Sequence, residues 1–205
     1  CREEFAEHVD KGCPMVLGGP LPHVIAAKAV AFQEVSTDEY KAYANRIVEN
    51  ASAFASALIA EGVSVLTGGT DNHLMLVNVT PFGLTGRQAE SAMRDATITL
   101  NRNSLPFDAN GPWYTSGLRI GTPALTTLGM GPDEMVEIAS IVKTVLANTS
   151  ASKITKGRNA GTLSKARYRT DEAALQQAQK QVSELLAKFP VYPEIDLKFL
   201  QQSFG

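Results

Sequence analysis

An arginine set between apolar residues is the side chain whose type and setting point most directly to chemistry. Arg119 lies in the run Thr-Ser-Gly-Leu-Arg-Ile-Gly-Thr-Pro-Ala at 115–124, with Leu118 and Ile120 beside it. A guanidinium on a short apolar strand must be paired if it is buried, and its fork binds a carboxylate through two parallel hydrogen bonds. Glycines on both sides leave room for a ligand. The residue types fit a substrate-carboxylate clamp and a structural salt bridge to Asp or Glu equally well.

A pair of glycines is the second candidate site. Gly18 and Gly19 stand in Leu-Gly-Gly-Pro at 17–20, just before an apolar, alanine-rich segment at 23–34. Paired glycines before a helix allow a ligand to approach the backbone, and the N–H groups can meet an anion such as phosphate. Gly-Gly-Pro is also, and more often, simply a turn.

Other patterns of catalytic or metal sites are missing from the sequence. It contains no Cys-x-x-Cys, His-Glu-x-x-His or Gly-x-Ser-x-Gly. The three histidines, His8, His23 and His73, are too far apart in sequence for a local metal motif, so we expect no metal. Two cysteines cannot form a disulfide framework.

The composition describes an ordinary soluble globular protein. Nineteen Lys and Arg stand against twenty-one Asp and Glu, the formal net charge is −2, and 44% of residues are hydrophobic. These values argue against a disordered chain and against a dedicated nucleic-acid binder, so we expect no nucleic-acid partner. No stretch approaches the ~20 apolar residues that cross a bilayer, so we expect no membrane partner. The segment 149–169 carries six cations and no acid, and we expect a basic, solvated surface insertion, a linker or loop rather than a folded element.

Hydrophobic periodicity and capping patterns predict the elements that must position these residues. Helices are expected at 3–11, 23–34, 36–62, 85–96, 131–147 and 170–188, and strands at 63–66, 73–79, 98–100 and 118–120, the first two antiparallel. We expect the helix at 23–34 to be buried on most sides. Residues 14–22 should not be helical, and residues 190–197 should be extended. The polar loop 101–116 should be ordered, because Phe107, Trp113 and Tyr114 are costly to expose.

This order of elements predicts an α+β (α/β layered) fold, with a small antiparallel sheet of three or four strands and helices packed on one face. We expect one compact domain from about residue 36 to residue 205, with residues 1–35 docking elsewhere. Residue 1 is Cys, and the first nine residues read as the charged edge of an element. We therefore expect the sequence to be a fragment of a longer polypeptide.

Three segments of the sequence resemble the serine hydroxymethyltransferase family. Residues 18–31, Gly-Gly-Pro-Leu-Pro-His-Val-Ile-Ala-Ala-Lys-Ala-Val-Ala, look like the segment after the large-domain core of that family. Asn-Arg-Asn-Ser-Leu-Pro-Phe-Asp at 101–108 and the arginine run at 115–124 look like its two C-terminal signatures, in the right order. Phe-Pro-Val-Tyr at 189–192 is similar to the family's C-terminal end.

The resemblance implies a fold-type I pyridoxal 5'-phosphate enzyme that interconverts serine plus tetrahydrofolate with glycine plus 5,10-methylenetetrahydrofolate. Residues 36–205 would be its C-terminal small domain, and residues 1–35 the tail of the large cofactor domain with a connecting helix. Arg119 would hold the substrate carboxylate. Gly18 and Gly19 would bind the cofactor phosphate across a dimer interface. The residues expected beside the folate are Asn103, Gly111, Pro112 and Trp113, of which Gly111 and Trp113 depart from the usual Ser-Pro-Phe.

The resemblance also implies that the catalytic residues lie elsewhere. The Schiff-base lysine of the family belongs upstream of this chain, and the match places Lys28 on a helix instead. The chain alone should therefore be inactive. The full-length enzyme should be a cytoplasmic homodimer or tetramer. Two alternatives remain: another fold-type I enzyme such as an aminotransferase, or a non-catalytic small-domain module. The glycine and asparagine motifs argue against the first, and retention of Arg119 and both glycines argues against the second.

Overall fold

A computed structural model describes residues 1–193, 195, 199 and 202 of the chain. It divides into two compact units, Cys1–Ala42 and Tyr43–Gly205, and each is described by itself. No described helix is both long enough and apolar enough to pass through a lipid bilayer.

The first unit consists of short helical segments. A 3-10 turn, η1 (Glu3–Phe5), leads into α1 (Ala6–Met15), and α2 spans Pro22–Val35. The expected helix end near Gly12 is wrong by a few residues, since α1 continues to Met15 through a kink at Cys13. Cys13 precedes a proline, which disfavours the α conformation and explains the kink.

Helix α2 forms where the sequence predicts it, but its expected burial is wrong. None of its residues is buried, and Ile25, Val30 and Phe32 are more than half exposed. An apolar pattern reports a preference for burial, whereas burial itself requires an element that covers the helix. The described residues of this chain do not supply that cover.

The second unit is built on a four-stranded antiparallel sheet in the order β1-β2-β4-β3. The strands are β1 (Ser64–Val65), β2 (Leu74–Asn78), β3 (Asn101–Asn103) and β4 (Gly117–Gly121). The turns η2 (Leu66–Gly68) and η3 (Thr80–Phe82) and the short helix α5 (Gly111–Tyr114) lie between these strands in the chain, and the short helix α6 (Pro123–Thr127) follows β4. The mixed helices and antiparallel sheet confirm the α+β expectation at this level.

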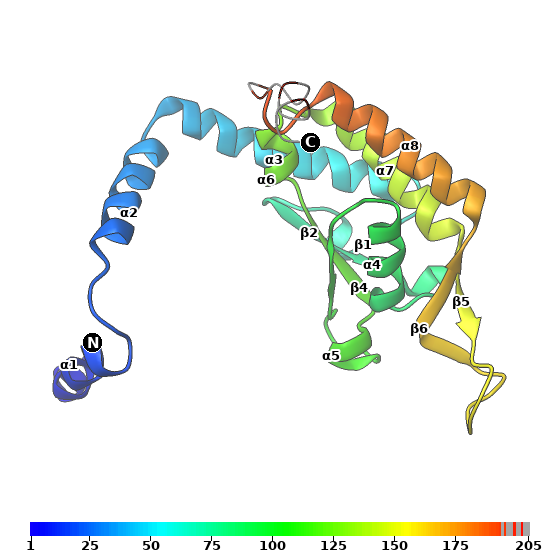
Figure 1. The fold of residues 1–205 in the computed structure, drawn as a ribbon, viewed down its shortest axis with the longest axis horizontal. Helices are drawn as coiled ribbons and strands as arrows, with labels where there is room; N and C mark the ends of the chain where they lie inside the picture. The colour runs from blue at the N-terminus through cyan, green and yellow to red at the C-terminus, as the bar shows by residue number, and fades with distance from the viewer. Residues whose placement is uncertain (194, 196–198, 200–201, 203–205) are drawn as a thin grey trace. The chain divides into compact units, whose positions relative to one another are not determined.

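Longer helices supply the rest of the core. They are α3 (Asp38–Ala60), α4 (Gly86–Asp95), α7 (Pro132–Ala147) and α8 (Glu172–Lys188), and α7 and α8 run side by side (Figure 1). The helix expected at 85–96 is confirmed as α4, and it begins with a capping box: Gln88 N donates to Thr85 Oγ1, and Thr85 N donates to Gln88 Oε1. The core joins the sheet to these helices through buried side chains such as Phe54, Val77, Leu118, Ile141 and Leu146.

The strand expected at 98–100 is wrong, because these residues complete the end of α4. Thr97 adopts a positive φ of 64°, and the Ile98 N–H donates to the Met93 carbonyl. The strand begins three residues later, at Asn101. The segment 101–116 contains β3 and the short helix α5. The expected burial of its aromatic side chains is wrong, since Phe107 is fully exposed and Trp113 is more than half exposed.

The expectation of an unfolded basic loop at 149–169 is also wrong. Strands β5 (Thr149–Lys153) and β6 (Leu163–Thr170) pair antiparallel as a separate hairpin that extends from the ends of α7 and α8 (Figure 1). The sequence signal was the alternation of charged and uncharged residues at 165–170, Lys-Ala-Arg-Tyr-Arg-Thr, which is typical of a strand with one face in solvent. The extended segment expected at 190–197 lies partly outside the described residues.

Candidate functional site

Arg119 lies in the middle of the sheet, on β4 between β2 and β3. Its register partners are Leu76 on one side and Asn101 on the other. Leu118 and Ile120 are buried in the core, so the alternation of the strand places Arg119 on the opposite, open face. The exposed arginine is therefore a consequence of strand periodicity in a run that reads as apolar.

The guanidinium of Arg119 is only partly satisfied. Its Nη2 donates to Asn101 Oδ1 at 3.2 Å, and no acidic side chain pairs with it in the described part of the chain. The alternative role of Arg119, a structural salt bridge to Asp or Glu, is therefore not found among the described residues. A fork with free N–H groups on an open sheet face can accept the two oxygens of a carboxylate.

Asn103 lies two residues from Asn101 on β3, opposite Gly117. Its side-chain amide donates to the Ser104 carbonyl at 2.7 Å. The two strands approach closely here, since a Cβ on Gly117 would collide with Leu105 and lie 3.0 Å from the Asn103 carbonyl oxygen. Glycine at this position allows β3 to pair beside Arg119.

The segment after β3 is folded around one carboxylate that the sequence analysis did not single out. Asp108 Oδ2 accepts the N–H groups of Leu105 and Ser116 at 3.0 and 2.7 Å. Its Oδ1 accepts the Asn110 N–H at 2.8 Å and the Ser116 hydroxyl at 2.7 Å. An Asp within a few residues of turn N–H groups is the signal that could have revealed it.

These hydrogen bonds change the acidity of Asp108. Burial by itself would raise the pKa of this carboxyl, but the bonds from Ser116, Asn110 and Leu105 outweigh burial and lower the pKa to about 2. The carboxylate is therefore ionised across the physiological range. It holds together a turn in which Phe107 and Thr115 both have positive φ, a conformation that costs non-glycine residues energy.

Trp113 is presented by this segment on the short helix α5. The side chain is 61% exposed, and its ring lies 5.2 Å from the guanidinium of Arg87 and 5.6 Å from that of Arg102. Arg102 is itself fixed by an ion pair to Glu90 at 2.9 Å. Cation–π contacts thus hold an exposed indole in place. Gly111, at φ +66°, and Pro112 begin α5.

Gly18 and Gly19 belong to the first unit and are described apart from Arg119. Both are exposed in the turn between α1 and α2, and Gly18 has a φ of +81°. A Cβ on either glycine would meet nothing within 4 Å, so no neighbour of the described chain requires glycine there by contact. No backbone partner is recorded for either N–H among the described residues, which leaves both able to bind an anion.

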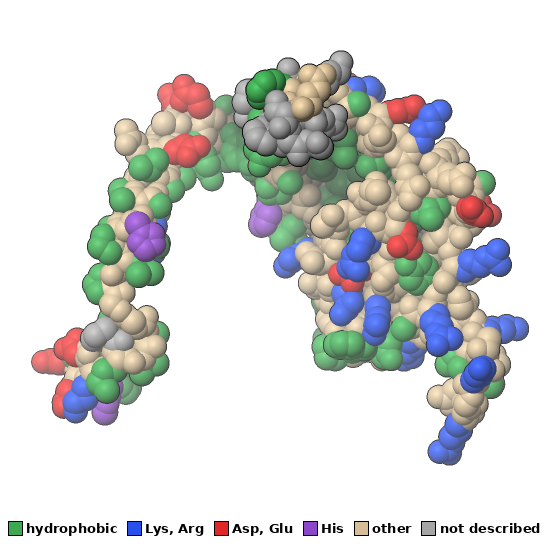
Figure 2. Space-filling model, viewed as in Figure 1, with side chains coloured by type: hydrophobic (Ala, Val, Ile, Leu, Met, Phe, Trp, Pro, Cys, Tyr) green, Lys and Arg blue, Asp and Glu red, His purple; other side chains and the backbone are tan. Residues whose placement is uncertain are grey.

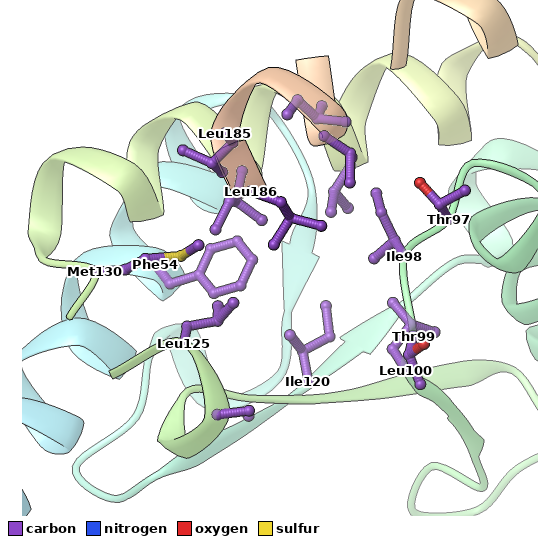
Figure 3. A pocket seen from close by; sticks show the side chains of 16 residues that line it. Phe54, Thr97, Ile98, Thr99, Leu100, Ile120, Leu125, Met130, Leu185 and Leu186 are labelled. Carbon is purple, nitrogen blue, oxygen red and sulfur yellow. The ribbon is translucent and has the colours of Figure 1, made fainter. Parts of the chain in front are cut away.

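An apolar cavity of about 270 Å³ lies on the other side of the sheet from Arg119 (Figure 3). Phe54, Ile120, Leu125, Met130 and Leu185 are among the side chains that line it. Its wall contains no ionisable group, so it offers no acid, base or clamp to a reaction.

The chain is similar to known proteins over its whole length. The family model of serine hydroxymethyltransferase matches residues 1–142. A protein named serine hydroxymethyltransferase from Treponema pallidum is 56% identical to this chain, over 100% of the chain and 35% of the relative. Another of the same name from Salinispora tropica is 55% identical, over 96% of the chain and 40% of the relative. One in Cutibacterium acnes is 50% identical, over 95% and 39%. The chain thus spans two fifths or less of the length of these relatives.

Proposed function

Since this chain belongs to the serine hydroxymethyltransferase family, we propose that it supplies the substrate-carboxylate clamp and a folate-facing surface of such an enzyme. The reaction interconverts serine plus tetrahydrofolate with glycine plus 5,10-methylenetetrahydrofolate. The activity is proposed for a polypeptide of the length of the relatives, of which this chain covers a part.

The open guanidinium of Arg119 is the observation that carries the proposal. Asn101 holds one edge of the side chain, and the strand presents the rest of it on the open face. A serine or glycine carboxylate would complete the fork with charge-assisted hydrogen bonds worth about 1.5–3 kcal/mol. Binding the carboxylate in this way orients the amino acid, so the remaining bonds at its α-carbon are directed at the reacting groups.

The segment 101–116 supports a folate-facing role for Asn103, Gly111, Pro112 and Trp113. Trp113 offers a flat, exposed ring that two arginines keep in place. Asp108 fixes the turn that carries this ring, so the surface is preorganised rather than ordered by the ligand. Tetrahydrofolate, with its flat ring system and carboxylates, suits an indole bordered by guanidinium groups.

Gly18 and Gly19 fit a role in binding the phosphate of pyridoxal 5'-phosphate. Their exposed N–H groups stand before the N-terminus of α2, where backbone donors favour an anion. The cofactor would supply the electron sink for the carbon–carbon bond change, and these residues would only hold its phosphate. The lysine that attaches the cofactor is assigned to another part of the polypeptide.

The domain and partner assignments are part of the same proposal. Residues 36–205 would form the small C-terminal domain, residues 1–35 would end the large cofactor domain, and a second subunit would complete a homodimer or tetramer in the cytoplasm. The exposed apolar side chains of α2 support a further covering polypeptide. The separate compactness of the second unit supports a domain boundary near the start of α3.

Arg119→Lys in the full-length enzyme tests the clamp. Lysine keeps the charge and loses the fork, so we expect the KM for serine to rise about 10–150-fold, from the loss of about 1.5–3 kcal/mol. Initial rates at saturating folate measure it. Arg94→Lys, on the exposed face of α4, is the matched control and should leave the KM unchanged. An unaltered serine KM in Arg119→Lys would refute the assignment.

A further inference from the structure

The outer face of the hairpin carries a row of cations. Along β6, exposed and half-buried residues alternate, and the exposed set includes Lys165, Arg167 and Arg169, here called the basic row. The register of the hairpin shifts between Ala151 and Lys153, and Ser164 Oγ accepts the N–H groups of Ala166 and Arg167. Strand β6 is therefore irregular where it carries Lys165 and Arg167. Three further cations, Lys153, Lys156 and Arg158, lie at the end of β5 and in the hairpin tip. Figure 2 shows Lys and Arg side chains gathered over this part of the second unit.

The cations of the hairpin are not neutralised by the described chain. None of the six forms a recorded ion pair with a described residue, and residues 149–170 contain no Asp or Glu. Like charges held this close repel one another and reduce stability. A chain with a net charge of −2 that concentrates positive charge in one place has the electrostatic footprint of a surface for a polyanion.

The backbone of the basic row is hydrogen-bonded to the start of α4. The buried Gln88 donates from Nε2 to the carbonyls of Ser164 at 2.7 Å and Arg167 at 2.8 Å. Thr85 Oγ1 donates to the Lys165 carbonyl at 2.8 Å. These contacts fasten β6 to the start of α4 and leave the charged side chains to the solvent.

Aromatic rings lie beside Lys165, the first residue of the basic row. Lys165 Nζ is 5.9 Å from the ring of Tyr114, and the next residue along α5 is the exposed Trp113. Rings beside cations favour a single-stranded nucleic acid, because its bases stack on aromatic faces and on guanidinium planes while its phosphates meet the cations. An acidic peptide would use the cations and leave the rings without a partner.

The hairpin also lies outside the part of the chain that the family model describes. That match ends at residue 142, whereas the relatives named above align over 95–100% of the chain. The family model thus leaves out the hairpin, although the Treponema pallidum relative aligns over it.

We propose that the basic row and the hairpin tip bind the phosphate backbone of single-stranded nucleic acid, with the rings at Trp113 and Tyr114 available to a base. The six cations have no role in the proposed enzymatic function, and Trp113 is the one residue that belongs to both proposed sites. It reverses the expectation drawn from net charge, because net charge averages over the surface while a polyanion meets one face of it.

Fluorescence anisotropy with a labelled 12-nucleotide oligouridylate and the full-length protein tests the proposal. The variant K165Q/R167Q/R169Q should bind at least tenfold more weakly than the unaltered protein. Its slope of log affinity against log salt should be smaller by about 2, for three lost phosphate contacts at ~0.7 each. The backbone contacts to Gln88 and Thr85 remain in this variant and the repulsion among the cations is relieved, so its unfolding temperature should not fall.

A charge-matched control separates the site from the overall charge. R46Q/K180Q/K188Q removes three exposed cations from α3 and α8 and should bind oligouridylate as the unaltered protein does. Absence of salt-dependent binding, or an equal loss in both triple variants, would overturn the proposal. So would a polyglutamate peptide that competes as well as oligouridylate, which would indicate an acidic peptide, or tighter binding of a duplex of the same length.

Discussion

Helices α2 and α7 are both rich in apolar residues, but they have opposite fates. Six residues of α7 are buried against the sheet and its neighbouring helices: Met135, Ala139, Ile141, Val142, Val145 and Leu146. No residue of α2 is buried. The difference lies in the surroundings, since α7 belongs to a unit with a sheet and three other long helices to cover it, and the first unit contains only α1, α2 and the start of α3.

An apolar helix is therefore predicted to be buried, but its own residues do not show which element buries it. A helix with an exposed Ile25, Val30 and Phe32 is a surface for further polypeptide. In the proposed enzyme this would be the large domain or a second subunit. The second unit, by contrast, buries its own core and should owe most of its stability to residues of this chain.

The largest expected difference comes from a matched pair of isoleucines. Ile141 lies on α7 and is 1% exposed. Its replacement by alanine should lower the free energy of unfolding by about 2–5 kcal/mol, because a cavity is left behind. Ile25→Ala, at a site 59% exposed on α2, should change it by less than about 0.5 kcal/mol. Urea unfolding of the chain measures both. A similar cost for Ile25→Ala would break the comparison and indicate that α2 is covered in solution.

A pair of glycines gives the next largest difference. A Cβ on Gly86, at the start of α4, would collide with the Thr115 side chain and lie 2.5 Å from the Gly117 carbonyl oxygen. Gly86→Ala should therefore cost about 1–3 kcal/mol by overpacking. In α1, Gly12 has nothing within 4 Å of the position of a Cβ, so Gly12→Ala should favour the helix by about 0.5–1 kcal/mol. Thermal unfolding followed by circular dichroism distinguishes the two, and a neutral Gly86→Ala would refute the close approach.

The smallest expected effect concerns the carboxylate at the turn of the 101–116 segment. Because folding lowers the pKa of Asp108 from 3.8 to about 2, its contribution is complete above pH 3.8 and is lost as the pH falls through about 2. The contribution is about 1–2 kcal/mol after allowance for solvent. In Asp108→Asn an NH2 group replaces one carboxylate oxygen, so two of the four donors lose their acceptor. This variant should lose a similar amount of unfolding free energy already at neutral pH.

Fluorescence of Trp113 reports this effect, because it is the only tryptophan in the sequence and lies on the affected segment. The unaltered chain should show an emission change between pH 4 and pH 2, and Asp108→Asn should show it at neutral pH. Asp133→Asn, on the exposed first turn of α7, is the control and should behave as the unaltered chain. An Asp108→Asn spectrum that matches the unaltered one would show that the carboxylate does not hold the turn.

Much of the second unit follows from local patterns in the sequence. The capping box at Thr85 predicts the start of α4, and the alternation at 73–79 predicts β2 and its antiparallel pairing with β1. Strand β4 was also predicted, with Arg119 as the exception in an apolar run. These features depend on neighbours a few residues apart, so periodicity and capping chemistry are sufficient to place them.

Features that depend on distant partners were missed. The hairpin is fastened by Gln88, which lies more than 70 residues before β6, so its run of cations read as a loop. The strand beside Arg119 begins at Asn101 because Thr97 and Ile98 complete α4 first. Asp108 was missed because its role depends on the fold of the turn, in which the backbone N–H groups of Leu105, Asn110 and Ser116 all donate to its carboxylate.

The sequence by itself determined the longer helices, the apolar faces, the family resemblance and the candidate residues Arg119, Gly18 and Gly19. Each of these is encoded in residue types at short spacing. Only the tertiary structure decided that Arg119 has no acidic partner among the described residues and that the basic segment is a paired hairpin. Pairing and burial are set by contacts between residues far apart in the chain, and a local pattern cannot specify which partner will be present.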